Sequence, residues 1–569
     1  MGVYFGGKYY ITPTTASAVV DSAMVSAGSA IGNLAAIVGI STGGKPKTPL
    51  LFSSPEDAKK TLIAGDLLDA VLAAFNPSNE TGGPSQVVAV RVNPADQAIG
   101  FMKDSGGNNV IALASTDYGA NANLIQHKVE AGSISGLRVT VQQGTTYYTQ
   151  DNIQRRVFSI KYTGPSGPAS MTIGGTTLTL VYDSKTTIID LTAYTTAQNL
   201  VNRLNIEPGF TASVLDGNYA VQTTNALDYV TTQSVGAEPY IALANLQAVI
   251  DWLNGASENL VDATRVTNAG NPPAVAPFHF LSGGADGSPS NLDWSDGFTA
   301  LQSYDVAWVS AATSDPSIAA MTDAHVVYMS TVGRKERRAI IGTALSTSNE
   351  GAIAAAASIN SDRTAVVHLG HYNYNESGQL HLYPPYITAA LLVGMFSAVS
   401  PGTPLTNKVI NVRGLERILT NPSETDTLLN GGVMPLESTE RGYLVTQSIS
   451  SCLWSNKYNR HEMSTGAALD FVAKSIRKAL DVLRGSKSDP ILLGRYVSTT
   501  DSVLRGLAIP EPNGPGVIVG DKLSPAYRGI TATMTGDVVQ VSFQCSPVIP
   551  NNYAFTTIYA VPYSGTATL

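Results

Sequence analysis

Short apolar runs alternate with amphipathic stretches in the first hundred residues, and this order predicts a β-α-β unit. Residues 34–40 (LAAIVGI) are almost continuously apolar and stop at Ser-Thr-Gly-Gly, as expected of a buried strand. Ser54 as the N-cap and Pro55 in the first helical position then predict a helical stretch that continues to Phe75. Residues 86–92 (QVVAVRV) predict the next strand, and the connection is long enough for the two strands to run parallel.

The amino-acid composition changes after this unit, and the sequence becomes rich in Thr, Gly, Ser and Tyr. Alternating polarity between Gly/Pro turns predicts strands here, and two apolar-periodic stretches predict short helices. The strands are expected at residues 137–141, 157–162 and 176–181, and the helices at 197–204 and 241–252. This β-rich region looks like an insertion, and a Pro/Gly-rich stretch closes it.

Alternation of helical and strand patterns then resumes. The helices are expected at residues 292–303, 316–331, 349–360 and 385–398, and the strands at 306–310, 338–343 and 364–369. Such interleaving favours a layered α/β sheet.

A last domain follows the boundary residues Pro401, Gly402 and Pro404. It has a strand pattern at residues 443–450 and an amphipathic helix pattern at 465–484. The polar face of that helix carries three basic residues, Lys474, Arg477 and Lys478. A final strand alternates cleanly, with one face formed by Val539, Val541, Phe543 and Cys545.

Both ends of the chain read as strands without a partner nearby. The first is residues 3–11, with strand-type side chains at Val3, Tyr4, Phe5, Tyr9 and Ile11, interrupted by Gly6 and Gly7. The second is residues 553–561 (YAFTTIYAV), with Tyr553, Phe555, Thr557 and Tyr559 on one side. Chain ends are normally polar and frayed, and an unpaired apolar strand favours aggregation. The two ends are therefore expected either to pack on their own body or to pair with another subunit.

These patterns predict a multi-domain protein of the α/β (α+β) class, with an α/β core, a β-rich insertion and a C-terminal α+β domain that carries two extended arms. The expected division is an N-terminal arm (1–28), an α/β middle domain (29–100 and 278–405), a β-rich outer insertion (101–277), a C-terminal domain (406–546) and a C-terminal arm (547–569).

Composition points to an assembly subunit. Only 14% of the 569 residues are charged, against about 25% in a typical soluble chain, while 43% are hydrophobic, so much of the surface is expected to face protein. The formal net charge of −8 argues against nucleic-acid binding. No stretch is apolar for long enough to cross a bilayer, and the N-terminus lacks a signal-peptide pattern, so we expect a soluble protein without membrane insertion. Cys452 and Cys545 are expected to be free, buried thiols.

Two motifs resemble enzyme signatures but lack the required chemistry. Residues 39–46 (GISTGGKP) have the glycine spacing of a phosphate-binding loop, but Pro46 stands where a Ser or Thr must hold magnesium. Pro46 and Pro49 also prevent the helix that a phosphate loop or a serine-nucleophile elbow requires. The histidine cluster His368, His371 and His381, with Glu376, falls in a loop and is interpreted as structural. We therefore predict no enzyme activity, no catalytic or metal residues and no cofactor.

The amino-acid sequences of several segments resemble those of the tail sheath proteins of contractile-tailed bacteriophages and related contractile injection systems. The segments are VYFGG at the start, LAAIVGISTGG, PLLFSSPEDAKKTLIAGDLLDAVLAAF, VVAVRVNPA, FLSGGADG, YPPYITAALLVGMFSAVSPGTPLTNKVI, TDTLLNGGVMPLE, YLVTQSIS and EMSTGAALDFVAKSIRKAL, in family order. No single motif is diagnostic, but the ordered set is, and the region from about residue 100 to 275 has no counterpart. This region is compatible with the outer insertions that vary between sheaths.

The resemblance implies a structural subunit that polymerises as stacked hexameric rings around an inner tube and contracts to drive the tube through a host envelope. Residues 3–11 and 553–561 would be strands donated to neighbouring subunits, the strand with Val539, Val541 and Phe543 would belong to the accepting sheet, and Lys474, Arg477 and Lys478 would face the tube. Expected partners are other copies of the chain, the inner tail tube protein, and baseplate and tail terminator proteins. Expected locations are the host bacterial cytoplasm during assembly and the virion tail afterwards. The alternative is a static fibre or adhesin subunit, which is also poor in charge and rich in β-structure.

Overall fold

The middle of the protein is a six-stranded sheet with the strand order β22-β21-β20-β3-β5-β4. Five strands are parallel, and the edge strand β4 runs antiparallel to β5. The strands are β3 (Ala35–Gly39), β4 (Pro49–Phe52), β5 (Val87–Arg91), β20 (Trp308–Ala311), β21 (Arg338–Gly342) and β22 (Thr364–Val367). This sheet confirms the expected α/β class. The computed structural model describes residues 3–5, 8–10, 33–165, 168–216, 226–255, 259–487 and 489–565.

Helices cover both faces of this sheet because its buried strands are apolar on both sides. In β3, Ala35 and Ile37 pack with one set of helices, and Ala36 and Val38 pack with the other. The first set contains α1 (Pro55–Leu62), α2 (Asp66–Phe75), α7 (Asn349–Ile359) and α8 (Pro385–Ala398), and the second contains α5 (Asn291–Leu301) and α6 (Pro316–Thr331). Ser54 caps α1 by accepting a hydrogen bond from the Asp57 amide, as its sequence position indicates.

Residues 407–462 cover α8 on the side away from the sheet. Ile410, Val433 and Met434 belong to the same hydrophobic cluster as α8, which explains why that helix is buried almost all round. The elements around α8 are β23 (His371–Tyr374), β24 (Leu380–Tyr383), β25 (Gly414–Leu415), α9 (Ser423–Asn430), β26 (Leu436–Thr439) and β27 (Gly442–Val445). By packing, this segment is part of the α/β body, although the sequence pattern groups it with the C-terminal domain. The strand expected at residues 443–450 ends at Val445.

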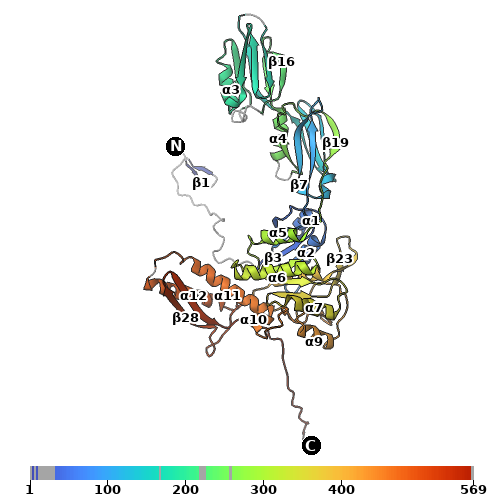
Figure 1. Cartoon of the computed structure of the whole chain (residues 1–569), viewed down its shortest axis with the longest axis vertical. Coiled ribbons are helices and arrows are strands. Elements are labelled where there is room, and N and C mark those ends of the chain that lie inside the picture. Colours follow the sequence, from blue (N-terminus) through green and yellow to red (C-terminus); the bar gives the residue numbers. More distant parts are fainter. Residues whose placement is uncertain are drawn as a thin grey trace, which may run out of the picture.

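The β-rich region 101–277 forms two units, one inserted in the other, and both extend away from the α/β body (Figure 1). The inner unit contains β6 (Gln97–Lys103), β7 (Asn109–Tyr118), the 3-10 turn η2 (Ala120–Leu124), β8 (Gln126–Ala131), β9 (Leu137–Gln143), β10 (Thr146–Ile153), α4 (Asn245–Gly255), β18 (Val261–Arg265) and β19 (Ala276–Phe280). The outer unit contains β11 (Arg156–Tyr162), β12 (Ser170–Gly174), β13 (Thr177–Tyr182), β14 (Lys185–Asp190), η3 (Leu191–Ala193), α3 (Ala197–Leu204), β15 (Phe210–Val214), β16 (Val230–Ser234) and β17 (Tyr240–Leu243).

The helix expected at residues 241–252 begins later than its sequence pattern indicates. Residues Tyr240–Leu243 form β17 and pair with β11, and α4 starts at Asn245. The Asp228 carboxylate accepts hydrogen bonds from the Asn245 and Leu246 amides at 2.7 and 3.0 Å, so a residue distant in sequence sets the helix start.

The last unit has a small core of its own beside the α/β body (Figure 1). It consists of α11 (Met463–Asp481), α12 (Pro490–Leu507), β28 (Tyr527–Thr535) and β29 (Val538–Cys545), preceded by the short helix α10 (Tyr458–His461). Its core includes Val472, Ile476, Leu504, Val517 and, half-buried, Phe543. None of the described helices is both long and apolar enough to span a membrane.

Candidate assembly interface

The hairpin β28-β29 presents one apolar and one polar face. Val539, Val541, Phe543 and Cys545 alternate with exposed neighbours, as the sequence pattern predicts. The apolar side faces the helices, where Phe543 and Cys545 join the core of the unit. The polar side carries cross-strand contacts such as Thr531 Oγ1 to Ser542 Oγ at 2.7 Å and a hydrogen bond from Arg528 Nε to Gln544 Oε1 at 2.8 Å.

Both outer edges of this hairpin are open. Within the described residues β28 and β29 form a sheet of two strands and pair along their length only with each other. The outward N–H and C=O groups of each strand can therefore accept a further strand. The half-buried Val539 and Val541 leave room for apolar side chains of an added strand on the inner face.

The C-terminal segment leaves the body near α10 and runs outward (Figure 1). Residues 553–561 form no strand in the single chain, and their large side chains are almost fully solvated: Phe555 is 94% exposed and Tyr559 86%. The strand pattern of this segment is thus unpaired within its own protomer. A run of exposed aromatic and β-branched residues without a partner marks a binding segment.

The N-terminal segment contains two short strands, β1 (Val3–Phe5) and β2 (Lys8–Tyr10), which pair antiparallel with each other. The sequence expectation of one donated strand over residues 3–11 differs from this hairpin. The pairing of β1 with β2 satisfies backbone groups of both strands within the single chain. Ile11 lies outside the described residues.

Both terminal segments are fixed to the body at their inner ends. The Asn33 side chain donates hydrogen bonds to the carbonyl groups of Phe396 and Val399 at 2.8 and 2.7 Å and accepts one from Trp308 Nε1 at 3.2 Å. At the other end, Thr465 Oγ1 donates to the Val548 carbonyl at 3.1 Å. Each terminal segment therefore starts from a defined point.

The basic residues of α11 do not form the free surface that the sequence indicates. Lys474 is 7% exposed and its Nζ lies 2.7 Å from the Asp305 carboxylate. Arg477 pairs with Glu336 and donates to the Arg334 carbonyl at 2.8 Å. Only Lys478 of the three is exposed. In the single chain Lys474 and Arg477 fasten α11 to the α/β body, although 40% of the Arg477 side chain stays exposed. Contact of these residues with a tube stays a prediction.

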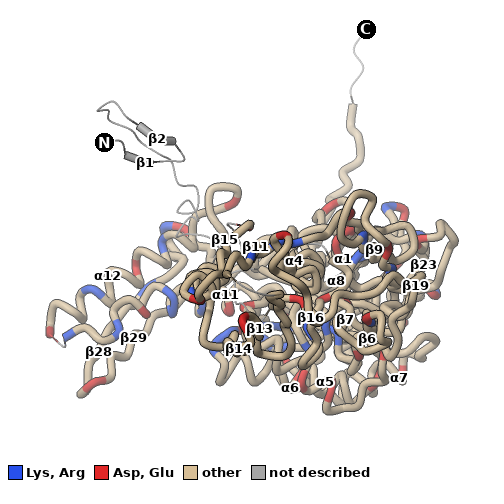
Figure 2. The backbone as a smooth tube through the Cα atoms, turned by 90° about the horizontal axis from the view of Figure 1, so that it is seen from above, with Lys and Arg blue, Asp and Glu red and all other residues tan. Residues whose placement is uncertain are grey.

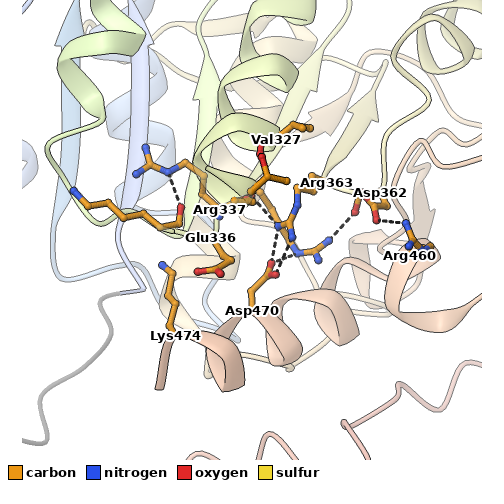
Figure 3. A network of polar contacts seen from close by, with 12 residues as sticks. Val327, Glu336, Arg337, Asp362, Arg363, Arg460, Asp470 and Lys474 are labelled. Carbon is orange, nitrogen blue, oxygen red and sulfur yellow. Dashed lines mark hydrogen bonds and ion pairs between the residues drawn. The ribbon is translucent and has the colours of Figure 1, made fainter. Parts of the chain in front are cut away.

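A second group of ion pairs continues this joint (Figure 3). Asp470 of α11 accepts from Arg338 Nε at 2.9 Å and from Arg363 Nη1 at 3.1 Å, while Arg460 Nη1 lies 3.0 Å from Asp362. Burial lowers the pKa of Arg338, and the Asp470 carboxylate opposes this shift. One carboxylate thus bridges two guanidinium groups at the contact between the C-terminal unit and the sheet.

We predict that Lys474→Ala loosens this joint whereas Lys478→Ala does not. The Lys474→Ala variant loses a buried charge-assisted hydrogen bond, which should lower the free energy of unfolding by about 1–2 kcal/mol. We expect the low end of this range because Asp305 is partly solvated. Replacement of the exposed Lys478 should lower the free energy of unfolding by less than about 0.5 kcal/mol. Hydrogen exchange of the α11 amides in the two variants measures the difference, and equal protection would contradict the assignment.

The glycine-rich loop after β3 is filled by groups of the chain itself. Ser41 Oγ donates to the Gly43 carbonyl at 2.8 Å, and the Gly44 amide donates to Asp117 Oδ1 at 2.8 Å. The buried Arg91 donates to the Gly44 carbonyl at 2.8 Å. Strand β4 precedes the next helix, so no helix N-terminus faces this loop. The loop links the sheet to the insertion.

The histidine cluster is divided between separate packing sites. His371 is buried and its Nδ1 lies 2.8 Å from Thr388 Oγ1, while His381 packs edge-on against Tyr383. Burial lowers the pKa of His368 to about 4 and that of His371 to about 4, so both rings are neutral. No group of three or more potential metal ligands occurs in the described part of the chain. Cys452 is buried and Cys545 half-buried, and neither forms a disulfide.

Charged residues are sparse along the backbone, with both signs intermixed (Figure 2). The longest basic cluster in the sequence, at residues 334–338, is consumed by internal contacts: Arg337 lies 2.9 Å from His325 Nε2 and donates to backbone carbonyls, and Arg338 binds Asp470. Among the residues that the structure describes, this cluster forms no basic stripe of the kind that binds nucleic acid.

Comparison with known proteins finds relatives that cover most or nearly all of the chain. The chain is 27% identical to the tail sheath protein of Bacillus phage SP01 over 587 aligned positions, which cover 99% of this chain and 98% of the relative. It is 28% identical to a putative tail sheath protein of Enterococcus phage phiEF24C, over 78% of this chain and 80% of the relative. No family model matches.

The fold agrees with these sequence relationships. A sheath tail protein from Listeria innocua superposes with a TM-score of 0.54 and 13% sequence identity, over 91% of this chain and 93% of the other. The nearly full-length match to a phage relative, the ordered sheath-like segments and this common fold lead to one conclusion. Over nearly its whole length, the chain is similar to phage tail sheath proteins.

Proposed function

We propose that this protein is the structural subunit of a contractile tail sheath, stacked as hexameric rings around an inner tube in a virion tail. Three observations support the proposal: tail sheath relatives along the whole chain, an unpaired strand-type segment at the C-terminus and an open two-stranded sheet in the C-terminal unit. The exposed C-terminal segment carries the argument, because it requires a partner that the single chain does not supply.

In this proposal the terminal segments join neighbouring copies by strand addition. Residues 553–561 of one copy, and residues 3–11 of another, pair with the open edges of β28 and β29, which include Val539, Val541 and Phe543. Main-chain hydrogen bonds hold the copies together, and the connecting segments allow the lattice to shorten without separating. Contraction is then a rearrangement of nearly rigid bodies and needs no nucleotide.

The remaining parts take roles that follow from their position. The two β-rich units form the outside of the cylinder, and the α/β body with residues 407–462 forms its middle layer. Of the three basic residues on α11, Lys478 is the one left to contact the tube. Baseplate and terminator proteins would bound the stack, which assembles in the host bacterial cytoplasm.

Electron microscopy of the purified chain tests the function. A sheath subunit forms hollow, ridged tubes with sixfold symmetry, particularly when tail tubes are present. Thin solid fibres would favour the static fibre or adhesin alternative, and dispersed particles at high protein concentration would contradict both.

A further inference from the structure

The C-terminal arm leaves the body beside a buried carboxyl group. Glu462 precedes α11 at its N-cap and is 1% exposed. Its Oε1 accepts hydrogen bonds from Gln447 Nε2 at 2.5 Å and from Asn552 Nδ2 at 2.6 Å. Asn552 is the last residue before the exposed segment that begins at Tyr553. Glu462 thus contacts the root of the arm.

The same contact leaves two oxygen atoms without a partner. Glu462 Oε2 and Asn552 Oδ1 are both buried, and neither has a hydrogen bond. A side-chain amide that donates through the hydrogen on the side of its own oxygen brings that oxygen toward the other carboxyl oxygen. Both of these atoms are acceptors if Glu462 is ionised, so nothing in the contact can satisfy them. A single proton on Oε2 would turn it into a donor for Asn552 Oδ1.

We propose that Glu462 holds a proton in the folded chain and forms a two-point acid–amide pair with Asn552, which fastens the root of the C-terminal arm. The pair consists of Asn552 Nδ2–H to Glu462 Oε1, which the structure contains, and Glu462 Oε2–H to Asn552 Oδ1. Loss of the proton removes the second bond and leaves a buried charge beside an oxygen. The arm root is then released.

The surroundings favour the protonated form. Burial raises the pKa of Glu462 above its ordinary 4.5, and the amides of Gln447 and Asn552 oppose this shift. His461 is the titratable neighbour that acts on Glu462, and its cationic form also lowers the pKa. The other polar groups beside the site that also lack partners are neutral hydroxyls, on Ser448 and Ser464. No counter-cation therefore contacts the carboxyl group among the described residues.

The direction of the pH effect follows from this raised pKa. The folded chain holds the proton more tightly than the unfolded chain does, so the stabilisation is complete below the ordinary pKa of 4.5 and is lost as the pH rises through the raised value. An alkaline shift should loosen the arm root. Any consequence for the cylinder rests on the proposed function, whereas the protonation itself does not.

Hydrogen exchange of the full-length, unpolymerised chain tests the pair. The amides of Val519 and Val548, which bond to Ser546 and Val517 across the arm root, report its closure. Their protection, corrected for intrinsic exchange, should fall by up to about tenfold per pH unit above the raised pKa in the natural chain. Glu462→Gln keeps both hydrogen bonds without a titrating proton and should make the protection independent of pH.

Asn552→Ala should lower the protection at every pH, and the adjacent exposed Asn551→Ala is the matched control that should not. Infrared spectra give a second measurement, because the natural chain should show a protonated carboxyl band above pH 4.5, the ordinary pKa of a Glu side chain, and Glu462→Gln should lack that band. Identical pH profiles for the natural chain and Glu462→Gln, or absence of that band, would overturn the proposal. Neither readout requires polymers, so failure here is distinct from failure of the sheath function.

Discussion

Removal of residues 553–569 is expected to abolish long polymers while leaving a folded monomer. The segment supplies the unpaired strand pattern, and a strand added to β28 or β29 would contribute several main-chain hydrogen bonds per subunit contact. Its side chains touch solvent, with Tyr553 already 72% exposed at the start. Loss of the segment should therefore change the free energy of unfolding by less than about 0.5 kcal/mol. Electron microscopy and sedimentation measure the polymers, and thermal unfolding measures the monomer.

A matched variant separates strand pairing from loss of exposed apolar surface. Thr557→Pro removes one backbone donor in the middle of the segment and should shorten the polymers strongly, because proline is excluded from central strands. Leu523→Thr removes an apolar side chain that is 95% exposed elsewhere in the same unit and should leave polymers intact. Normal tubes from the truncated chain would count against strand donation by the C-terminal arm.

Local signals in the sequence were sufficient to predict most helices and strands of the α/β body. Ser290 and Asp293 form a reciprocal capping box at the start of α5, and Asp315 with Pro316 starts α6. Such signals depend on residues within one turn of each other, so they survive without knowledge of the fold. Helix α12 had the same kind of start, with Asp489 as N-cap and Pro490 after it, and this signal could have revealed it.

Contacts between residues that are distant in sequence determine the features that the sequence did not predict. Lys474 looks solvent-facing on a helical wheel, but its partner Asp305 is 169 positions away, and only the packed fold brings the two together. The segment 407–462 has weak periodicity of its own because it is shaped by α8, whose apolar surface it covers. The two β-rich units share one composition, so their division follows from pairing and separate cores, which composition does not encode.

The joint between α11 and the sheet should be most sensitive to Asp470. Asp470→Ala leaves the buried Arg338 and the largely buried Arg363 without their carboxylate, and uncompensated buried charge is strongly destabilising. We expect the free energy of unfolding to fall by about 3 kcal/mol. This is the low end of the effect of removing one partner of a buried ion pair, because Arg363 and Asp470 keep some solvent contact. Protection of the α11 amides against hydrogen exchange should fall correspondingly.

Asp481→Ala on the same helix is the matched control for this prediction. Its carboxylate is 57% exposed and pairs at 3.0 Å with Arg484, which is 75% exposed. Such surface pairs contribute about 0–1 kcal/mol, so the control should unfold almost like the natural chain. Equal effects of the two substitutions would show that the Asp470 ion pairs do not hold the joint. If Asp470→Ala instead weakens the joint and the polymers together, the C-terminal unit must be held rigidly to the body for the arms of neighbouring copies to reach their sheets.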